Sequence, residues 1–277
     1  MDILLYNPLS RNGKNPKFIK KVSKKINKSG DVLLQNILDI DDVDLYIKGL
    51  KDDDRVIIIG GDGTLNRIVN RIYDKTFKQE IYMYRGGTGN DFIRSLKTKK
   101  HMVPLKSYIK DLPVAIYNDK EIRFLNGAGI GVDGYVGHLI NQSDKKKNQL
   151  NYFKHALKAF GVFKPMEATL TLDGKTIHEK RVWLVSVMHG AYYGGGMKVA
   201  PMAKRNEKAL HVVMLKDIPK WLLIMIFPTI YLGWHPIFKR YVSFYKVDHV
   251  ALSFKEDAHM QIDGEHDFPV REMICHT

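Results

Sequence analysis

Two glycine-rich turns have the residue types and spacing that could bind phosphate. They are Gly60-Gly61-Asp62-Gly63-Thr64 and Gly86-Gly87-Thr88-Gly89-Asn90, and each follows a short apolar run. Glycine lets the backbone approach a ligand closely, and a following helix N-terminus offers unpaired N–H groups and partial positive charge. Neither turn fits the P-loop or the Gly-x-Gly-x-x-Gly pattern. The spacing is equally consistent with two tight turns in which Thr64 and Asn90 are helix N-caps.

Asp62 adds a carboxylate to the first turn, where it would repel phosphate groups. Such a residue makes sense if it holds a divalent cation, directly or through water, or if it orders the loop. The simpler alternative is a turn aspartate that hydrogen-bonds its own backbone.

The flanking segments predict the elements that position these turns. Residues 56–59 are wholly apolar and β-branched, which is typical of a parallel strand buried on both faces. Residues 3–6 and 81–84 predict two further strands. An amphipathic helix is predicted directly after the first turn by apolar residues at i, i+3, i+4 and i+7, namely Leu65, Ile68, Val69 and Ile72. This alternation predicts a doubly wound α/β domain over residues 1–112.

The pattern changes near Pro113. Strand-like runs at 114–117, 122–125, 168–172, 182–187, 210–215 and 250–254 are separated by turn signals such as Asp173-Gly174. We therefore expect residues 113–277 to form a mostly antiparallel β domain.

Composition narrows the classes of partner. The 277 residues include 44 Lys and Arg against 30 Asp and Glu, a formal charge of +14 that favours anionic partners. No nucleic-acid-binding module is recognisable, so we expect no nucleic-acid partner. A single cysteine, Cys275, excludes an internal disulfide framework and fits a cytoplasmic protein. The N-terminus lacks the basic region of a signal peptide.

Motifs along nearly the whole chain resemble those of the diacylglycerol kinase catalytic-domain family, in its bacterial soluble lipid kinase branch. The resemblance implies an N-terminal α/β domain related to NAD kinases and a C-terminal antiparallel β-sandwich domain, with ATP and lipid meeting in the cleft. The motifs are Asn7-Pro8-Leu9-Ser10, Gly60 to Asn66, Gly87 to Phe92, Phe124-Leu125-Asn126, Gly129 to Asp133, Tyr193 to Met197, Ala200-Pro201 and Ile262-Asp263-Gly264-Glu265.

The resemblance also implies roles for individual residues. Asp263 corresponds to the catalytic base, with Glu265 beside it, while Asp133 matches an acidic position near the active site and Asp62 lies in the nucleotide motif. A carboxylate can orient a lipid hydroxyl and accept its proton, while Mg²⁺ and N–H groups neutralise phosphate charge. The implied ATP-binding residues are Asn7, Ser10, Gly60, Gly61, Asp62, Gly63, Thr64, Leu65, Asn66, Gly87, Thr88, Gly89 and Asn90.

Two departures from the family pattern affect the implied sites. Arg11 follows Ser10 where the family usually has glycine. In this branch a loop after Ala-Pro holds a structural Mg²⁺ through an aspartate and two backbone carbonyls. The corresponding residues are Glu207 and the carbonyls of Lys204 and Ala209, with Lys208 in place of the family's glycine.

The segment 221–238 carries no Lys, Arg, Asp or Glu and is flanked by Lys216, Lys220, Lys239 and Arg240. With Trp221, Tyr231 and Trp234, it is expected to dock on an anionic membrane or to line an acyl-chain pocket. The alternative is ordinary core packing.

These observations predict a cytoplasmic, peripherally membrane-associated kinase that transfers phosphate from ATP to a hydroxyl of diacylglycerol or a related lipid. The alternatives are a catalytically impaired lipid- or nucleotide-binding protein of the same fold and an NAD-kinase-like enzyme. The preferred lipid and the oligomeric state are not predicted.

Overall fold

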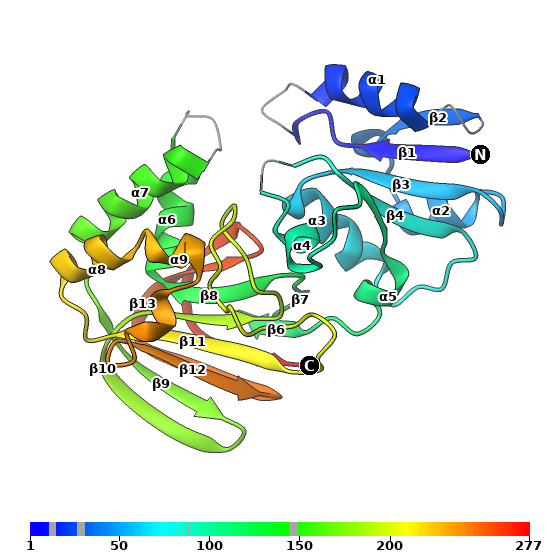
Figure 1. Cartoon of the computed structure of the whole chain (residues 1–277). Coiled ribbons are helices and arrows are strands. Elements are labelled where there is room, and N and C mark those ends of the chain that lie inside the picture. The colour runs from blue at the N-terminus through cyan, green and yellow to red at the C-terminus, as the bar shows by residue number, and fades with distance from the viewer. Residues whose placement is uncertain (11–14, 27–30, 88, 144–148) are drawn as a thin grey trace.

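The computed structural model describes residues 1–10, 15–26, 31–87, 89–143 and 149–277, which form two bodies, each built on its own β-sheet (Figure 1). The N-terminal body contains a five-stranded sheet in the order β2-β1-β3-β4-β5. Its first four strands are parallel, and β5 runs antiparallel to β4. The strands are β1 (Asp2–Tyr6), β2 (Val32–Asn36), β3 (Arg55–Gly60), β4 (Glu80–Arg85) and β5 (Met102–Pro104).

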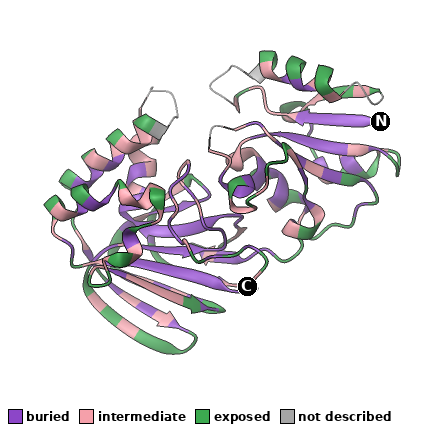
Figure 2. Ribbon diagram, viewed as in Figure 1, coloured by how far each residue is buried: buried purple, intermediate pink, exposed green. Residues whose placement is uncertain are grey.

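Helices cover both faces of this sheet, because successive strand residues point to opposite sides. Val56 and Ile58 of β3 pack with α3, whereas Ile57 and Ile59 pack with Ile19 of α1. Figure 2 shows the resulting purple, buried strands. The helices are α1 (Asn15–Ile26), the 3-10 helix η3 (Ile37–Asp39), α2 (Val43–Lys48), α3 (Asp62–Ile72), α4 (Asp91–Ser95) and α5 (Lys106–Ile109).

The strand order places the first glycine turn at a ligand-binding edge. The chain moves from β1 outward to β2 and from β3 outward in the other direction to β4, so a topological switch point lies between β1 and β3. Open α/β sheets bind ligands beyond the carboxyl ends of their strands at such points. Asn7 follows β1 and Gly61 follows β3 at this edge.

The C-terminal body contains nine antiparallel-paired strands in the order β12-β11-β10-β8-β13-β14-β6-β7, and β9 pairs with both β10 and β13. One half of β10 and of β13 pairs with β8, and the other half pairs with β9. The strands are β6 (Val114–Tyr117), β7 (Lys120–Arg123), β8 (Gly127–Gly131), β9 (Met166–Leu172), β10 (Lys175–Met188), β11 (Leu210–Lys216), β12 (Val242–Val247), β13 (His249–Ile262) and β14 (Glu265–His276).

Helices gather on one side of this second sheet (Figure 1). The segment 221–238, which carries no charged side chain, forms most of three of them. The helices are α6 (Val132–Asn141), α7 (Gln149–Val162), α8 (Lys220–Ile226), α9 (Thr229–Leu232) and the 3-10 helix η4 (His235–Ile237).

The predicted strand runs of the second half all fall on strands, although Phe124 and Leu125 lie beyond the end of β7. The boundary expected between residues 112 and 113 stays a prediction, and β6 begins at Val114.

Candidate active site

The two glycine turns pack against each other through their backbones. A β-carbon built on Gly87 would lie 2.6 Å from the Cα atom of Gly61, and one built on Gly86 would lie 3.0 Å from the Gly60 nitrogen. No side chain fits at such distances, which explains the glycines. The two turns therefore form one continuous backbone surface at the switch point.

Each turn leads into a helix N-terminus, and of the two expected N-caps the structure has Asn90 but not Thr64 at that position. Helix α3 begins at Asp62, with Gly61 as its N-cap, so Thr64 is inside the helix and does not cap it. Asn90 does hold the N-cap position of α4, in the left-handed region. Its side chain accepts a hydrogen bond from the Gly87 N–H at 3.0 Å and donates one to the Gly87 carbonyl at 2.7 Å. It thereby braces the second turn, in which Thr88 lies outside the described residues.

Asp62 connects the two helix starts. Its carboxylate accepts hydrogen bonds from the backbone N–H groups of Asp91 at 3.1 Å and Phe92 at 2.9 Å. A negative charge is favourable at a helix N-terminus. The contacts are those of a loop-ordering residue, and they fix α4 against the first turn.

The loop after β1 is tied to the same place. Asn7 donates to the Thr64 hydroxyl at 3.4 Å and accepts from the Leu9 N–H at 2.9 Å. Ser10 donates to the Asn7 carbonyl at 2.8 Å. Arg11 lies outside the described residues.

Two residues of the predicted nucleotide motif point away from this surface. Leu65 is wholly buried in the core of the N-terminal body. Asn66 is also buried, and its amide donates to the Arg123 carbonyl and to Asp263. Their side chains are therefore engaged in packing and in joining the two bodies.

Asp263 lies in the tight turn between β13 and β14, with a positive φ of 47°. One carboxylate oxygen accepts from the N–H groups of Asn126 (2.8 Å) and Gly127 (3.1 Å). The other accepts from the Leu125 N–H (2.6 Å) and the Asn66 amide (2.7 Å). The fold thus brings residue 263 to the helix that follows the first glycine turn. Burial raises the pKa of Asp263.

Glu265 has a different environment two residues later. Its side chain is 54% exposed and accepts from Arg67 of α3 at 2.8 Å. A β-carbon on Gly63 would lie 3.7 Å from its Oε1 atom. Glu265 is thus an accessible carboxylate beside the first glycine turn.

Asp133 is buried in the first turn of α6. It accepts from the Tyr193 hydroxyl at 3.2 Å and from the Gln261 amide at 3.4 Å, and burial raises its pKa. Gln261 in turn accepts from the Gly264 N–H at 3.1 Å. A short chain of polar contacts therefore joins Asp133 to the turn that carries Asp263 and Glu265.

The Tyr193–Met197 loop reaches from the C-terminal body to the N-terminal one. Its Gly195 N–H donates to Asp91 at 2.8 Å. Burial, and then the neighbouring Asp62 charge, raise the pKa of Asp91 to about 7.

An apolar pocket lies behind this loop, and Asp133 and Tyr193 form part of its wall. Helices α6 to α9 and the sheet supply the remaining wall, including Tyr152, Phe160, Leu223 and Phe227. Part of the segment 221–238 therefore lines an apolar pocket, and the expectation that this pocket takes acyl chains stays a prediction.

The sequence reasoning missed Arg205, which is buried between the two bodies. It donates to the Ser95 hydroxyl at 2.7 Å, to the Leu125 carbonyl and to the Asn126 side chain at 2.8 Å. Burial lowers its pKa to about 10. The sequence offers no signal for this role, because a lone arginine in a basic chain looks like a surface residue.

The expected structural Mg²⁺ site fits this chain poorly. Glu207 accepts from Lys246 at 2.8 Å and lies 3.5 Å from the Lys204 ammonium group, and Lys246 lowers its pKa. The Lys204 carbonyl already accepts from the Glu207 N–H at 3.0 Å. A divalent ion would have to displace these two ammonium groups from Glu207. We assign no function to a metal there.

Family models of known proteins match most of the chain. Residues 2–114 match the family model "Diacylglycerol kinase catalytic domain", and residues 127–274 match "YegS C-terminal NAD kinase beta sandwich-like domain". The chain belongs to the diacylglycerol kinase family. The expectation of a lipid kinase with an α/β domain followed by a β-sandwich-like domain is thereby confirmed.

Individual relatives agree with this family. A Bacillus subtilis protein named "Putative lipid kinase YtlR" is 30% identical over 236 residues, which cover 76% of this lipid kinase and 74% of the relative. The "Diacylglycerol kinase" of the same organism is 25% identical over 228 residues, covering 78% and 73%. A crystal structure described as a "putative diacylglycerol kinase" from Bacillus anthracis superposes with a TM-score of 0.69 at 23% identity, covering 99% and 91%.

Among the helices that the structure describes, none has the length and apolar character to span a membrane.

Proposed function

We propose that this lipid kinase transfers the γ-phosphoryl group of ATP to a hydroxyl of diacylglycerol or a similar lipid. The observation that carries the proposal is the position of the apolar pocket. Asp133 in its wall connects through Gln261 to the Asp263 turn, and the loop that carries Tyr193 donates a hydrogen bond from Gly195 to Asp91, directly after the second glycine turn. A lipid whose chains enter the pocket would present its headgroup toward the phosphate-binding surface.

The phosphates of ATP are expected to lie on the surface made by Gly60, Gly61, Gly63, Gly87 and Gly89. The first N–H groups of α3 have no partner within the helix and face this surface. Hydrogen bonds hold these turns in place, and they are made by the side chains of Asn7, Ser10, Asp62 and Asn90. Mg²⁺ bound to the nucleotide would supply further charge neutralisation during transfer.

We propose Glu265, rather than Asp263, as the group that accepts the hydroxyl proton. All four acceptor positions of the Asp263 carboxylate are filled by N–H donors. It would have to give up one of these bonds to reach a substrate. Glu265 is accessible and lies beside Gly63, where the reacting phosphate is expected. Asp263 then positions the turn that presents Glu265.

An assay with ATP, Mg²⁺ and vesicles containing diacylglycerol, monoacylglycerol, phosphatidylglycerol, ceramide or sphingosine tests this proposal. Wild type is expected to phosphorylate at least one lipid. Glu265→Gln should lower the kcat by roughly 10²–10⁴-fold, the usual contribution of a general base, with an unchanged melting temperature. Asp263→Asn should lower the melting temperature, because an amide cannot accept all four bonds.

Glu272→Gln changes an exposed carboxylate on the same strand, β14, and should keep full activity. Full activity of Glu265→Gln would disprove its assignment as proton acceptor. If wild type binds ATP but phosphorylates no lipid, the protein is a binding protein; if it phosphorylates NAD instead, the NAD-kinase-like alternative holds.

We also propose that α8, α9 and η4 dock on an anionic membrane. Trp221, Met225, Trp234 and Ile237 are 60–71% exposed, whereas Leu223 and Ile226 face the pocket. Exposed tryptophans favour the membrane interface, and Lys220, Lys239 and Arg240 flank the segment. The membrane would then lie next to the pocket through which a lipid must enter.

Vesicle sedimentation tests this docking. Combined Trp221→Ser and Trp234→Ser substitution should weaken binding to phosphatidylglycerol vesicles by about tenfold or more, because two interfacial side chains are lost. Leu45→Ser is the matched control, since Leu45 is an equally exposed apolar residue on α2. Equal binding by the double variant and wild type would rule out this surface.

A further inference from the structure

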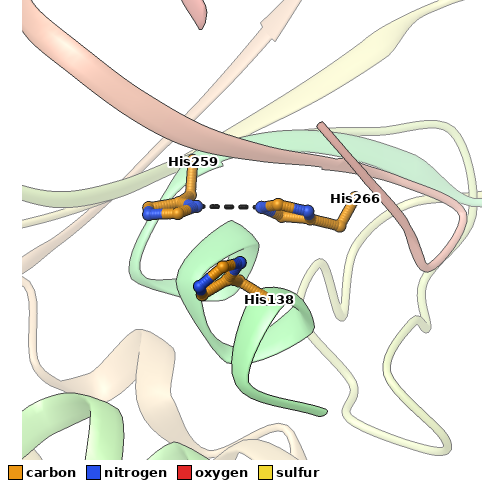
Figure 3. Close-up of side chains that lie close together, drawn as sticks. All are labelled: His138, His259 and His266. Carbon is orange, nitrogen blue, oxygen red and sulfur yellow. Dashed lines mark hydrogen bonds between the residues drawn. The ribbon is translucent and has the colours of Figure 1, made fainter. Parts of the chain in front are cut away.

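Three histidines from separate elements converge where α6 packs on the β13–β14 hairpin (Figure 3). His138 comes from α6, His259 from β13 and His266 from β14. One ring nitrogen of each lies within 4.8 Å of the others. His259 Nδ1 and His266 Nε2 are 2.8 Å apart, and the three ring centroids are 4.8–5.2 Å from one another.

Gly134 of α6 allows this approach, because a β-carbon there would lie 2.4 Å from the His259 carbonyl carbon. Gly137 faces His266, where an added β-carbon would make an ordinary van der Waals contact at 3.6 Å with the His266 Cβ atom. The helix therefore packs directly on the β13–β14 hairpin. His138 follows Gly137, so its ring is held next to the other two.

We propose that His138, His259 and His266 bind a Zn²⁺ ion or a similar imidazole-preferring transition metal ion. Zinc takes imidazole nitrogens at about 2.0–2.1 Å in tetrahedral geometry, which places ligand nitrogens about 3.3 Å apart. The observed separations bracket this value, because His259 Nδ1 and His266 Nε2 are at hydrogen-bond distance (2.8 Å) and the ring nitrogens of all three residues lie within 4.8 Å of one another. All three histidines are partly exposed, which leaves the fourth position for water.

The environment of the rings suits metal binding. Imidazole nitrogen is one of the ligands that Zn²⁺ prefers in proteins, and three of them converge here. Phe268 stacks on His259 at 4.3 Å between ring centroids, and Tyr135 packs against both His259 and His138, which limits the movement of these rings.

The bound ion would crosslink α6 to the β13–β14 hairpin. Asp133 lies at the start of α6, and Glu265 directly precedes His266. The metal would therefore stabilise the relative positions of both, without itself lying in the phosphate site.

Titration of chelator-treated full-length protein with ZnCl2, followed by calorimetry and melting temperature, tests the site. Wild type should bind one ion per chain with a rise in melting temperature. His138→Asn and His266→Asn should each weaken binding by more than the roughly 10–100-fold that loss of a supporting residue costs. CoCl2 should give the visible absorption of tetrahedral cobalt in wild type only.

His249→Asn is the control, because His249 and His276 form another cross-strand histidine pair on the same two strands. It should bind Zn²⁺ as wild type does. The proposal is wrong if wild type does not bind Zn²⁺ under these conditions, if the His138 and His266 variants bind it equally well, or if His249→Asn abolishes binding. Melting temperatures of the metal-free variants show whether each one folds.

Discussion

The carboxyl group of Asp91 lies between the two bodies, where burial and Asp62 raise its pKa to about 7. In the unfolded chain an aspartate has a pKa near 3.9, so between about pH 4 and pH 7 the folded state holds a proton that the unfolded state has lost. The stability of wild type against unfolding therefore falls, through this group, as the pH rises across that window.

Asp91→Asn removes this dependence while keeping an acceptor for the Gly195 N–H. Relative to wild type, the variant should gain on the order of 2 kcal/mol of unfolding free energy between pH 5 and pH 8. Urea unfolding at several pH values measures this difference. Asp257→Asn, which alters an exposed ion pair with Arg271, should show no such trend. A constant difference between Asp91→Asn and wild type would contradict the assigned pKa shift.

Single residues differ in how far the sequence predicts them. The glycines at 60, 61 and 87 are recognisable because few structures other than tight turns need such clusters. The environment of Asp263 cannot be recognised from the sequence, because the groups that donate hydrogen bonds to it come from Asn66 and residues 125–127, which are far from it in the sequence. The sequence thus locates the acidic pair but cannot tell which carboxylate is accessible.

Among the elements, the turn after β4 depends on the close contact between Gly87 and Gly61. Gly87→Ala would place a methyl group 2.6 Å from the Gly61 Cα atom, so one turn must move. We expect ATP binding to weaken by about tenfold or more, together with a loss of stability of roughly 1–3 kcal/mol from overpacking. Calorimetric titration with ATP and thermal unfolding measure the two effects.

Gly161→Ala is the matched control in helix α7, because a β-carbon there meets no atom within 4 Å. Alanine should stabilise that helix slightly. ATP affinity of Gly87→Ala equal to that of the control would mean that the turns do not form the phosphate surface.

Prediction of the elements succeeds where periodicity is strong and fails where it is weak. The apolar run at 56–59 and the stripe from Leu65 to Ile72 correspond to β3 and α3. Strand β8 reads Gly-Ala-Gly-Ile-Gly, whose strand propensity is low apart from the isoleucine, and it forms because β10 and β13 flank it. The composition of the segment 221–238 does not distinguish core packing from an exposed surface, because its helices bury one side and expose the other.

At the scale of the whole molecule, Arg205 holds the N-terminal and C-terminal bodies together. Arg205→Met would leave the Leu125 carbonyl and the Asn126 side chain without this donor inside the interface. We expect a loss on the order of 3 kcal/mol in the free energy of unfolding, measured by urea denaturation. Arg71→Met, on the exposed surface of α3, should change it little. If Arg205→Met and Arg71→Met lost the same free energy of unfolding, Arg205 would not stabilise the interface.

The close packing of the two glycine turns also predicts how the kinetics of nucleotide binding should look. Since Gly60 and Gly61 pack directly against Gly86 and Gly87, the backbone surface that they form is preorganised and should lose little conformational entropy on binding. Nucleotide association should then be a single kinetic step. Under the proposed function, slow and saturable rearrangements during turnover are expected instead around the apolar pocket, which α7, α8 and α9 line.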